Sequence, residues 1–189
     1  PASAVKELVE NSIDAGAKNI TIELQNGGMT FLRITDDGCG MDPVDARTAF
    51  LRHATSKIRK KEDLACIGTL GFRGEALAAI SSVSKIDLLT RAQGAETGVR
   101  LHLEAGQVLS EEPAGCPCGT TILVRELFYN TPARMKFMKS DAAESSAVFA
   151  AIQQQALAHP EISFRFLKDG QEQLHTDGQG DRMAAIYAI

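Results

Sequence analysis

The spacing of the apolar residues changes abruptly at Gly16, and this change constrains the fold more than any other feature of the chain. Before Gly16, one helical face is marked by residues at i, i+3, i+4, i+7 and i+8, namely Val5, Leu8, Val9, Ser12 and Ile13. After it, apolar residues alternate, at Ile20, Ile22 and Leu24 and again at Leu32 and Ile34. Asn26-Gly27 between the two runs is a favoured pair for a tight turn. The sequence therefore predicts a helix over 4–15, closed by Gly16, followed directly by an antiparallel hairpin.

The remaining patterns do not alternate regularly between strand and helix. Helical spacing is present at 43–51, 75–82 and 141–158, and again from Asp181 onward. Asp42 and Pro43 are suited to the N-cap and the first position of the second helix. Strand-like alternation is present at 86–89, 99–103, 121–124 and 162–166. This order predicts an α/β (α+β) fold, a two-layer sandwich in which helices cover one mixed, largely antiparallel sheet.

Composition favours one folded domain and excludes several classes of protein. Hydrophobic residues make up 44% of the 189 residues, which is enough for a sizeable core. The 20 basic and 24 acidic side chains give a net charge of −4, so nucleic-acid binding would depend on local patches. No apolar stretch approaches the roughly 18 residues of a membrane-spanning helix, and the start of the chain does not resemble a secretory signal. We expect no membrane association.

The cysteines indicate a reducing compartment. The spacing of Cys39, Cys66, Cys116 and Cys118 fits no zinc motif, and a chain of this size needs no disulfides. Cys116-Pro117-Cys118 alone is a weak signal for a metal or redox site. We therefore expect reduced thiols and a cytoplasmic protein.

The first predicted helix carries a polar stripe opposite its apolar face. Glu7, Asn11 and Asp14 are spaced i, i+4 and i+7. Such a stripe is usually a solvated helix surface. A carboxylate that polarises water beside an amide oxygen that binds Mg²⁺ is the alternative interpretation, and Asn, a poor helix former, favours it slightly.

A second group of residues follows the predicted hairpin. Asp36 continues the alternation of Leu32 and Ile34, so its carboxylate is expected to point inward, where it needs a partner or a ligand. Gly38 and Gly40 permit positive φ and close approach of the backbone to a ligand. A tight strand-to-helix turn without a ligand is an equally good interpretation of these glycines alone.

Residues 52–74 have little regular pattern and combine basic side chains with glycines. Five basic residues and no acidic one occur between 52 and 61. Gly68, Gly71 and Gly74 then precede a predicted helix, and a glycine-rich loop before a helix presents N–H groups to an anion. Neither GxxxxGK[ST] nor GxGxxG is present. A phosphate-binding lid is favoured over a flexible linker.

Taken together, these motifs resemble those of the GHKL ATPases, and their amino-acid sequences resemble those of the MutL mismatch-repair branch. The resemblance rests on five segments, which are 6–17 (KELVENSIDAGA), 36–40 (DDGCG), 52–57 (RHATSK), 71–77 (GFRGEAL) and 127–134 (LFYNTPAR). The 71–77 segment separates this branch from gyrase and chaperone relatives. The resemblance implies the GHKL, or Bergerat, ATP-binding fold and an ATPase that requires ATP and Mg²⁺.

The resemblance also implies a role for each motif residue. Glu7 would activate the attacking water and Asn11 would bind Mg²⁺, while Asp36 would accept the adenine amino group. The base pocket would be shaped by Gly38, Gly40 and Met41 and supported near Asp36 by Thr121 together with Thr120. The phosphates would be covered by Thr55, Lys57, Leu70, Gly71, Phe72, Arg73, Gly74 and Glu75.

Further expectations concern domains and partners. The resemblance implies an ATPase domain at 1–178 that lacks a leading segment, then a linker and the start of a second, truncated domain at 179–189. Relatives draw a lysine from that second domain, so we expect weak or no hydrolysis by this chain. ATP would order the lid and promote N-terminal dimerisation of the full-length protein, with this piece monomeric. A MutS-type mismatch-recognition protein is the implied partner.

DNA is the other expected partner. Residues 125–139 hold four basic side chains (Arg125, Arg134, Lys136 and Lys139) against Glu126, a local charge of 4 − 1 = +3. We expect weak, salt-dependent binding of single- or double-stranded DNA. The alternative function is a nucleotide-independent DNA-binding or scaffolding module on the same fold.

Overall fold

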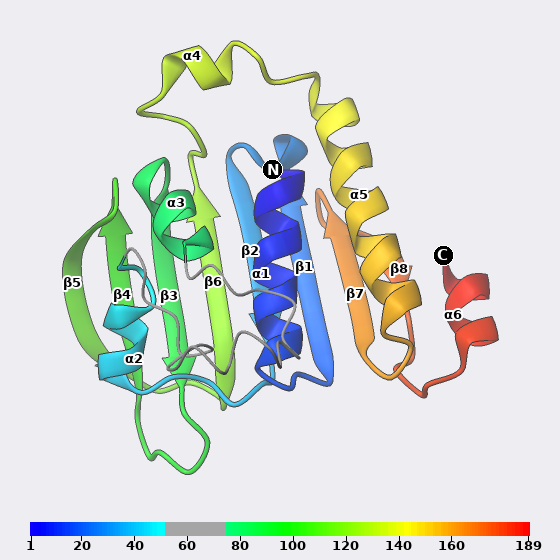
Figure 1. The fold of residues 1–189 in the computed structure, drawn as a ribbon, viewed down its shortest axis with the longest axis horizontal. Helices are drawn as coiled ribbons and strands as arrows, with labels where there is room; N and C mark the ends of the chain where they lie inside the picture. The colour runs from blue at the N-terminus through cyan, green and yellow to red at the C-terminus, as the bar shows by residue number, and fades with distance from the viewer. Residues whose placement is uncertain (52–74) are drawn as a thin grey trace, which may run out of the picture.

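A computed structural model describes residues 1–51 and 75–189 and contains a single eight-stranded sheet (Figure 1). The strands lie in the order β5-β4-β3-β6-β2-β1-β7-β8. Only the β1–β7 pair is parallel among these neighbours. The bounds are Asn19–Gln25 (β1), Phe31–Asp36 (β2), Lys85–Arg91 (β3), Gly98–Glu104 (β4), Gln107–Ala114 (β5), Gly119–Arg125 (β6), Ser163–Lys168 (β7) and Gln171–His175 (β8). The predicted mixed, largely antiparallel sheet is confirmed.

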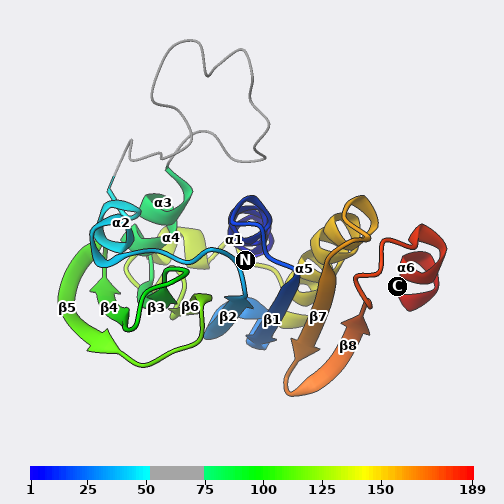
Figure 2. The same ribbon diagram turned by 90° about the horizontal axis from the view of Figure 1, so that it is seen from below.

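The helices α1, α2, α3 and α5 lie on one face of this sheet, so the molecule has two layers (Figure 2). Helix α1 packs between α3 and α5, and α6 packs against α5. The bounds are Ala2–Asp14 (α1), Pro43–Thr48 (α2), Ala76–Ser82 (α3), Pro132–Met135 (α4), Asp141–Ala158 (α5) and Arg182–Ala188 (α6). The α/β sandwich expected from the order of the sequence patterns is confirmed.

The core lies between the sheet and its helices. Leu8 and Val9 on the apolar face of α1 are buried, as are Ile22, Leu32 and Phe164 on the facing side of the sheet. Each such side chain contributes roughly 1.5–3 kcal/mol of apolar transfer free energy. The apolar stripe and the alternating runs thus meet at one interface, which fixes the register of α1 over β1 and β2.

Local turn chemistry follows the sequence. Asp42 caps α2, since its Oδ1 accepts hydrogen bonds from the backbone N–H groups of Val44 and Asp45 at 2.8 Å each. Gly16 has a φ of 75° at the end of α1, and Gly27 and Gly28 have positive φ in the hairpin turn. No helix in the ranges 1–51 and 75–189 is long and apolar enough to span a bilayer.

Two strands and one short helix were not expected. Strand β5 is exposed along almost its whole length, and in β8 only Leu174 is buried. Strands at the edges of a sheet need no alternating apolar pattern, because both of their faces can be exposed to solvent while one edge pairs with the neighbouring strand. Helix α4 is a single short turn that begins at Pro132. The predicted phosphate-binding lid falls within 52–74, outside the described residues.

Candidate functional site

A row of three polar residues crosses the sheet beneath the helices. In the antiparallel ladders, Asp36 of β2 lies opposite Thr120 of β6, and Thr120 lies opposite Thr90 of β3. Residues directly opposite each other in such ladders share a face of the sheet. All three therefore stand on the helix-covered face, where the residues two positions away along each strand (Ile34, Ile122 and Leu88) are apolar and buried.

Asp36 accepts hydrogen bonds from three sides. The Ser12 hydroxyl of α1 donates to Oδ2 at 2.7 Å, the Gly38 N–H donates to Oδ1 at 3.0 Å, and the backbone of Thr120 also donates to this carboxylate. Burial raises the pKa of Asp36 above its ordinary value, and these hydrogen bonds oppose the shift only in part. The expectation that this side chain needs a partner is met within the chain, and its oxygens retain capacity to accept from a ligand.

The turn after β2 passes very close to other backbone segments. A Cβ on Gly38 would lie 2.8 Å from Ala15 Cβ, and one on Gly40 would overlap the carbonyl oxygen of Arg91. Gly40 also has a φ of 65°. The backbone N–H of Met41 donates to the Thr90 hydroxyl at 3.0 Å, which fastens the turn to β3. Both glycines are therefore required by packing, whether or not a ligand also approaches them.

The neighbouring carboxylate, Asp37, has a different task. It accepts from the backbone of Lys18 at 2.8 Å and from the backbone and side chain of Asn19 at 2.9 Å and 2.7 Å. Burial favours a higher pKa, but these hydrogen bonds outweigh it and lower the pKa of Asp37. Asp37 thus ties the turn to the start of β1.

The polar stripe of α1 is partly covered. Glu7, Asn11 and Asp14 are all half-buried, which differs from a fully solvated surface. Glu10, one helical turn before Asp14 and next to the stripe, is buried and contacts Lys6 at 3.5 Å and Gln155 at 3.3 Å. The described residues contain no cluster of three or more His, Cys, Asp or Glu side chains that could cage a metal. A cation here would take an oxygen of Asn11 and complete its shell with ligand oxygens and water, which is how Mg²⁺ usually binds.

Thr120 and Thr121 point to opposite faces of the sheet. Thr121 pairs with Thr35 and Leu89, and its hydroxyl donates to Thr35 Oγ1 at 3.2 Å on the uncovered face. Thr120 alone stands beside Asp36. The structure does not bring Thr121 into the group around Asp36, because successive side chains of a strand alternate between faces.

The remaining residues expected at the site are Glu75, which is described, and several residues between 52 and 74, which are not. Glu75 is exposed and occupies the N-cap of α3. The lid residues Thr55, Lys57, Leu70, Gly71, Phe72, Arg73 and Gly74 lie outside the described residues.

The sequence reasoning missed two members of the site, Ser12 and Thr90. Ser12 is buried and interrupts the apolar face of α1 at the position that meets Asp36. Thr90 is completely buried and follows Ile86 and Leu88 in phase, as Asp36 follows Leu32 and Ile34. A polar residue in an apolar phase was therefore a usable signal for both.

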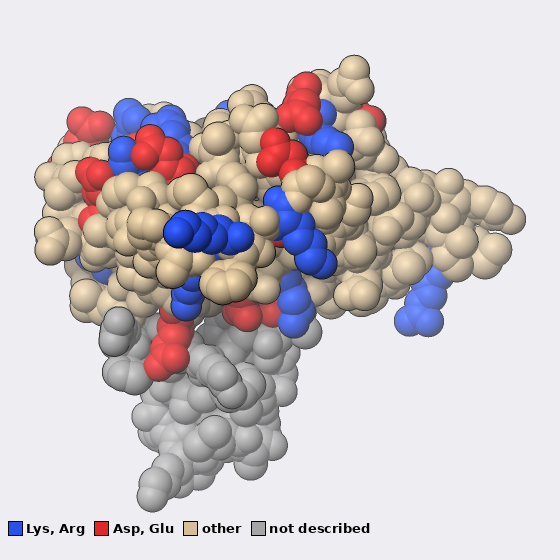
Figure 3. Space-filling model, turned by 90° about the horizontal axis from the view of Figure 1, so that it is seen from above, with Lys and Arg blue, Asp and Glu red and all other residues tan. Residues whose placement is uncertain are grey.

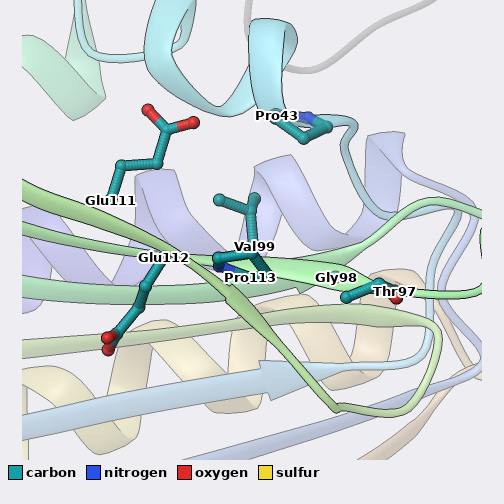
Figure 4. Close-up of a pocket in the computed structure, with 7 residues that line it drawn as sticks. All are labelled: Pro43, Thr97, Gly98, Val99, Glu111, Glu112 and Pro113. Carbon is teal, nitrogen blue, oxygen red and sulfur yellow. The ribbon is translucent and has the colours of Figure 1, made fainter.

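Two hollows in the described part of the chain lie away from Asp36. One of about 330 Å³ lies between the start of α2 and strands β4 and β5 and is lined by Pro43, Thr97, Gly98, Val99, Glu111, Glu112 and Pro113 (Figure 4). Its two carboxylates point apart, and Glu111 is paired with Arg47 of α2 at 3.2 Å. Another, of about 370 Å³, is on the uncovered face and includes Thr121. Neither is lined by Glu7, Asn11 or Asp36.

The cysteines of the described ranges are unbonded. Cys39, Cys116 and Cys118 are free thiols. The Cys118 thiol lies 3.5 Å from the Gly38 carbonyl oxygen, and the Cys116 carbonyl accepts a hydrogen bond from Arg91 at 2.6 Å. These contacts attach the Cys-Pro-Cys segment to the turn after β2 and to β3.

Comparison with known sequences places this arrangement among nucleotide-binding proteins. The family model for histidine kinase-, DNA gyrase B- and HSP90-like ATPases matches residues 1–114. The chain is 50% identical over 189 residues to the DNA mismatch repair protein MutL of Agathobacter rectalis, covering all of this chain and 29% of the relative. It is 52% identical over 190 residues to MutL of Symbiobacterium thermophilum, covering 100% of this chain and 30% of the relative. The chain thus spans under a third of the length of these relatives.

Solved structures agree. The Aquifex aeolicus MutL ATPase domain complexed with ADP superposes with a TM-score of 0.79 at 33% identity, covering 99% of this chain and 68% of that one. The N-terminal domain of a DNA repair protein gives a TM-score of 0.81 at 30% identity, covering 99% of this chain and 55% of that one.

Proposed function

Because the chain belongs to the GHKL ATPases and, within them, to the MutL mismatch-repair family, we propose that it is an Mg-ATP-binding and slowly hydrolysing switch domain. The observation that carries the proposal is the hydrogen-bonded Asp36 carboxylate beside Thr120, at the end of β2. An inward carboxylate held by three donors presents its remaining lone pairs in a fixed direction, which suits recognition of an amino group.

The adenine base would bind at the row formed by Asp36, Thr120 and Thr90. Asp36 would accept from the adenine amino group, and Thr120 would stand beside it. Gly38, Gly40 and Met41 would form the adjoining wall, and their close packing on Ala15 and Arg91 supports this by fixing the path of the turn. The assignment moves the supporting role from Thr121 to Thr120, because only Thr120 shares the face of Asp36.

The phosphates would lie toward the polar stripe of α1. Asn11 would hold Mg²⁺ through its amide oxygen, and Glu7, one helical turn earlier, would orient and deprotonate the attacking water. Bound Mg²⁺ would supply neutralisation of the developing phosphate charge. The half-burial of Glu7 and Asn11 supports these roles, since partial exclusion of water strengthens electrostatic interactions.

The lid, the dimer and the domain boundary remain proposals drawn from the family. Residues 52–74 and Glu75 would close over the phosphates, and closure would favour dimerisation of two such domains. We place the ATPase domain at 1–178 and the start of a second domain at 179–189. A lysine from that domain would be needed for full turnover, so this chain alone would hydrolyse ATP weakly.

DNA and a MutS-type protein are the proposed macromolecular partners, in a cytoplasmic, nucleoid-associated setting. Arg134, Lys136 and Lys139 are exposed on and after α4. Figure 3 shows Lys and Arg side chains across the middle of the face that carries α4, with acidic side chains beside them. This mixture supports weak binding to DNA phosphates rather than tight binding.

Calorimetry with a non-hydrolysable ATP analogue and Mg²⁺ tests the proposal. The wild-type chain is expected to bind the analogue, and Asp36→Ala is expected to lose at least about 100-fold in affinity, because an unpaired base amino group costs several kcal/mol. Equal binding by both proteins would refute the adenine assignment. Tight binding of single-stranded DNA with no binding of nucleotide would instead favour the scaffolding alternative.

A further inference from the structure

Thr90 occupies the centre of the hydrogen-bond network behind the proposed base site, and nothing in the family motifs singles it out. It lies in β3, one strand beyond Thr120 and two beyond Asp36. Its side chain is completely excluded from solvent. A buried hydroxyl in a sheet core is costly unless its hydrogen bonds are made.

All the capacity of this hydroxyl is used. The Met41 N–H donates to Thr90 Oγ1 at 3.0 Å, the carbonyl oxygen of Gly119 lies 3.0 Å from the same atom, and Thr120 Oγ1 also lies 3.0 Å from it. A hydroxyl has one proton to donate and two lone pairs that accept. A carbonyl oxygen can only accept, so the proton of Thr90 goes to Gly119.

The direction of the remaining bond follows. Because Thr90 has no second proton, the hydroxyl of Thr120 must donate in the Thr90–Thr120 bond. Thr120 is then left with lone pairs and no free proton on the side of Asp36. The two groups in this part of the row, the Asp36 carboxylate and the Thr120 oxygen, are therefore both acceptors.

We propose that Thr90 is a positioning residue that sets the base specificity of this site by fixing Thr120 as a hydrogen-bond acceptor. Two adjacent acceptors fit a base that presents an exocyclic amino group and disfavour a base that presents a carbonyl oxygen there. Adenine and hypoxanthine differ in this respect, so Thr90 governs the preference for one over the other. The inference rests on the proposed nucleotide-binding function.

The test measures the ratio of affinities for ADP and inosine diphosphate, by calorimetry with Mg²⁺, on the 189-residue chain. Thr90→Val keeps the shape of the side chain and removes the hydroxyl, which frees the Thr120 proton to face the base. We expect the preference of the wild type for ADP to narrow about tenfold in this variant. Thr90→Ser restores the hydroxyl and is expected to keep the ratio within about twofold of wild type.

Two controls separate positioning from stability. Thr35→Val removes a hydroxyl from the neighbouring position of β2 on the uncovered face, where its partner is Thr121, and is expected to leave the ratio unchanged. A general loss of stability lowers both affinities together and leaves their ratio unaltered. If Thr90→Val does not unfold cooperatively, Thr90→Ala is compared with Thr90→Ser instead. Both of these variants lack the γ-methyl group, and they differ only in the hydroxyl.

A folded Thr90→Val or Thr90→Ala protein with the wild-type ratio would overturn the inference while leaving the proposed function intact. Absence of ADP binding by the wild type would overturn the proposed function itself. The two failures are thus distinguishable.

Discussion

The carboxylates of Asp36 and Asp37 are adjacent in the chain, yet their pKa values are shifted in opposite directions. Burial beneath α1 raises the pKa of Asp36. For Asp37, burial acts in the same sense but is outweighed by the donors of Asn19 and Lys18, which lower its pKa. The strand therefore ends on one carboxylate kept easy to protonate and one kept ionised, and the two can be separated by titration.

Nucleotide affinity is expected to fall on acidification, through the raised pKa of Asp36. Protonation removes the negative charge of the carboxylate and places an O–H donor on one of its oxygens, which weakens its bond to the base amino group. Affinity is therefore full above that pKa and declines as the pH falls below it. Binding should be measured by calorimetry from about pH 8 to about pH 4.5, a range that brackets an elevated carboxyl pKa. Asp37→Asn, which leaves Asp36 in place, is expected to keep the decline but to move it to somewhat lower pH, because the charge of Asp37 helps to raise the pKa of Asp36. An affinity that is flat across the range contradicts the role of Asp36.

Asp37 is expected to stabilise the fold at neutral pH, and this contribution is also lost in acid. Its lowered pKa stabilises the fold above the ordinary value of 3.8, and this contribution is lost as the pH falls through the folded pKa. Asp37→Asn should therefore lower the free energy of unfolding by about 1 kcal/mol at pH 7, the scale of a lost exposed hydrogen bond, and by less in acid. Urea unfolding measures both, with Glu96→Gln, an exposed acid-to-amide change, as the matched control.

Asn11→Ala is expected to remove the part of nucleotide affinity that depends on Mg²⁺. The amide oxygen is the proposed protein ligand, and alanine has none. Affinity for the ATP analogue should be compared with Mg²⁺ and with a chelator for both proteins. In chelator the two should agree within about threefold, whereas only the wild type should gain on adding Mg²⁺. An equal gain by the variant would assign the ion to other oxygens.

Gly40→Ala is expected to destabilise the fold by about 3 kcal/mol or more, because it combines positive φ with overlap of the Arg91 carbonyl. Gly94→Ala separates these effects, since Gly94 has a φ of 81° but no atom within 4 Å of an added Cβ, and should cost about 1 kcal/mol. Gly115→Ala, with open space and no positive φ, should be close to neutral. Thermal unfolding of the three variants gives the order, and a neutral Gly40→Ala would contradict the close packing of the turn.

The basic segment after β6 is expected to carry DNA binding. Replacing Lys136 and Lys139 with Glu should reduce affinity for a single-stranded oligonucleotide and flatten the plot of log affinity against log salt by roughly 1–2 units. The control changes the same charge elsewhere, with Lys18→Glu and Arg182→Glu at exposed positions outside the 125–139 segment. Equal losses in the two double variants would show that net charge alone governs the binding.

Much of the fold was predictable because its signals are periodic and buried. The face of α1, the hairpin at Asn26-Gly27 and the span of α5 follow from spacing alone, and the structure confirms them. Strands β5 and β8 were missed because edge strands carry little burial pattern. Their position depends on ladder hydrogen bonds with partners distant in sequence, which local spacing does not encode.

The site was predictable for residues that break a pattern and not for those whose role depends on a partner. Asp36 is identifiable as a charge in an apolar phase. Residues 120 and 121 are both threonine, so the sequence does not distinguish them. Only the pairing of β6 with β2 and β3 shows that Thr120 shares the face of Asp36. Ser12 and Thr90 also interrupt an apolar phase, but a buried hydroxyl indicates a ligand site less strongly than a buried carboxylate, because burying a charge costs more.

Because Thr120 and Thr121 point to opposite faces of the sheet, a change in the length of β6 would alter the site. Inserting one residue between them, with the rest of β6 held in its ladder, would turn Thr120 toward the uncovered face, whereas inserting two would restore its side. Changes in the length of the loop at 115–118 do not alter the face on which Thr120 lies, because the ladder and not the loop sets the register of β6. Natural and engineered variation in length should therefore accumulate before Gly119 and be absent from the strand that follows it.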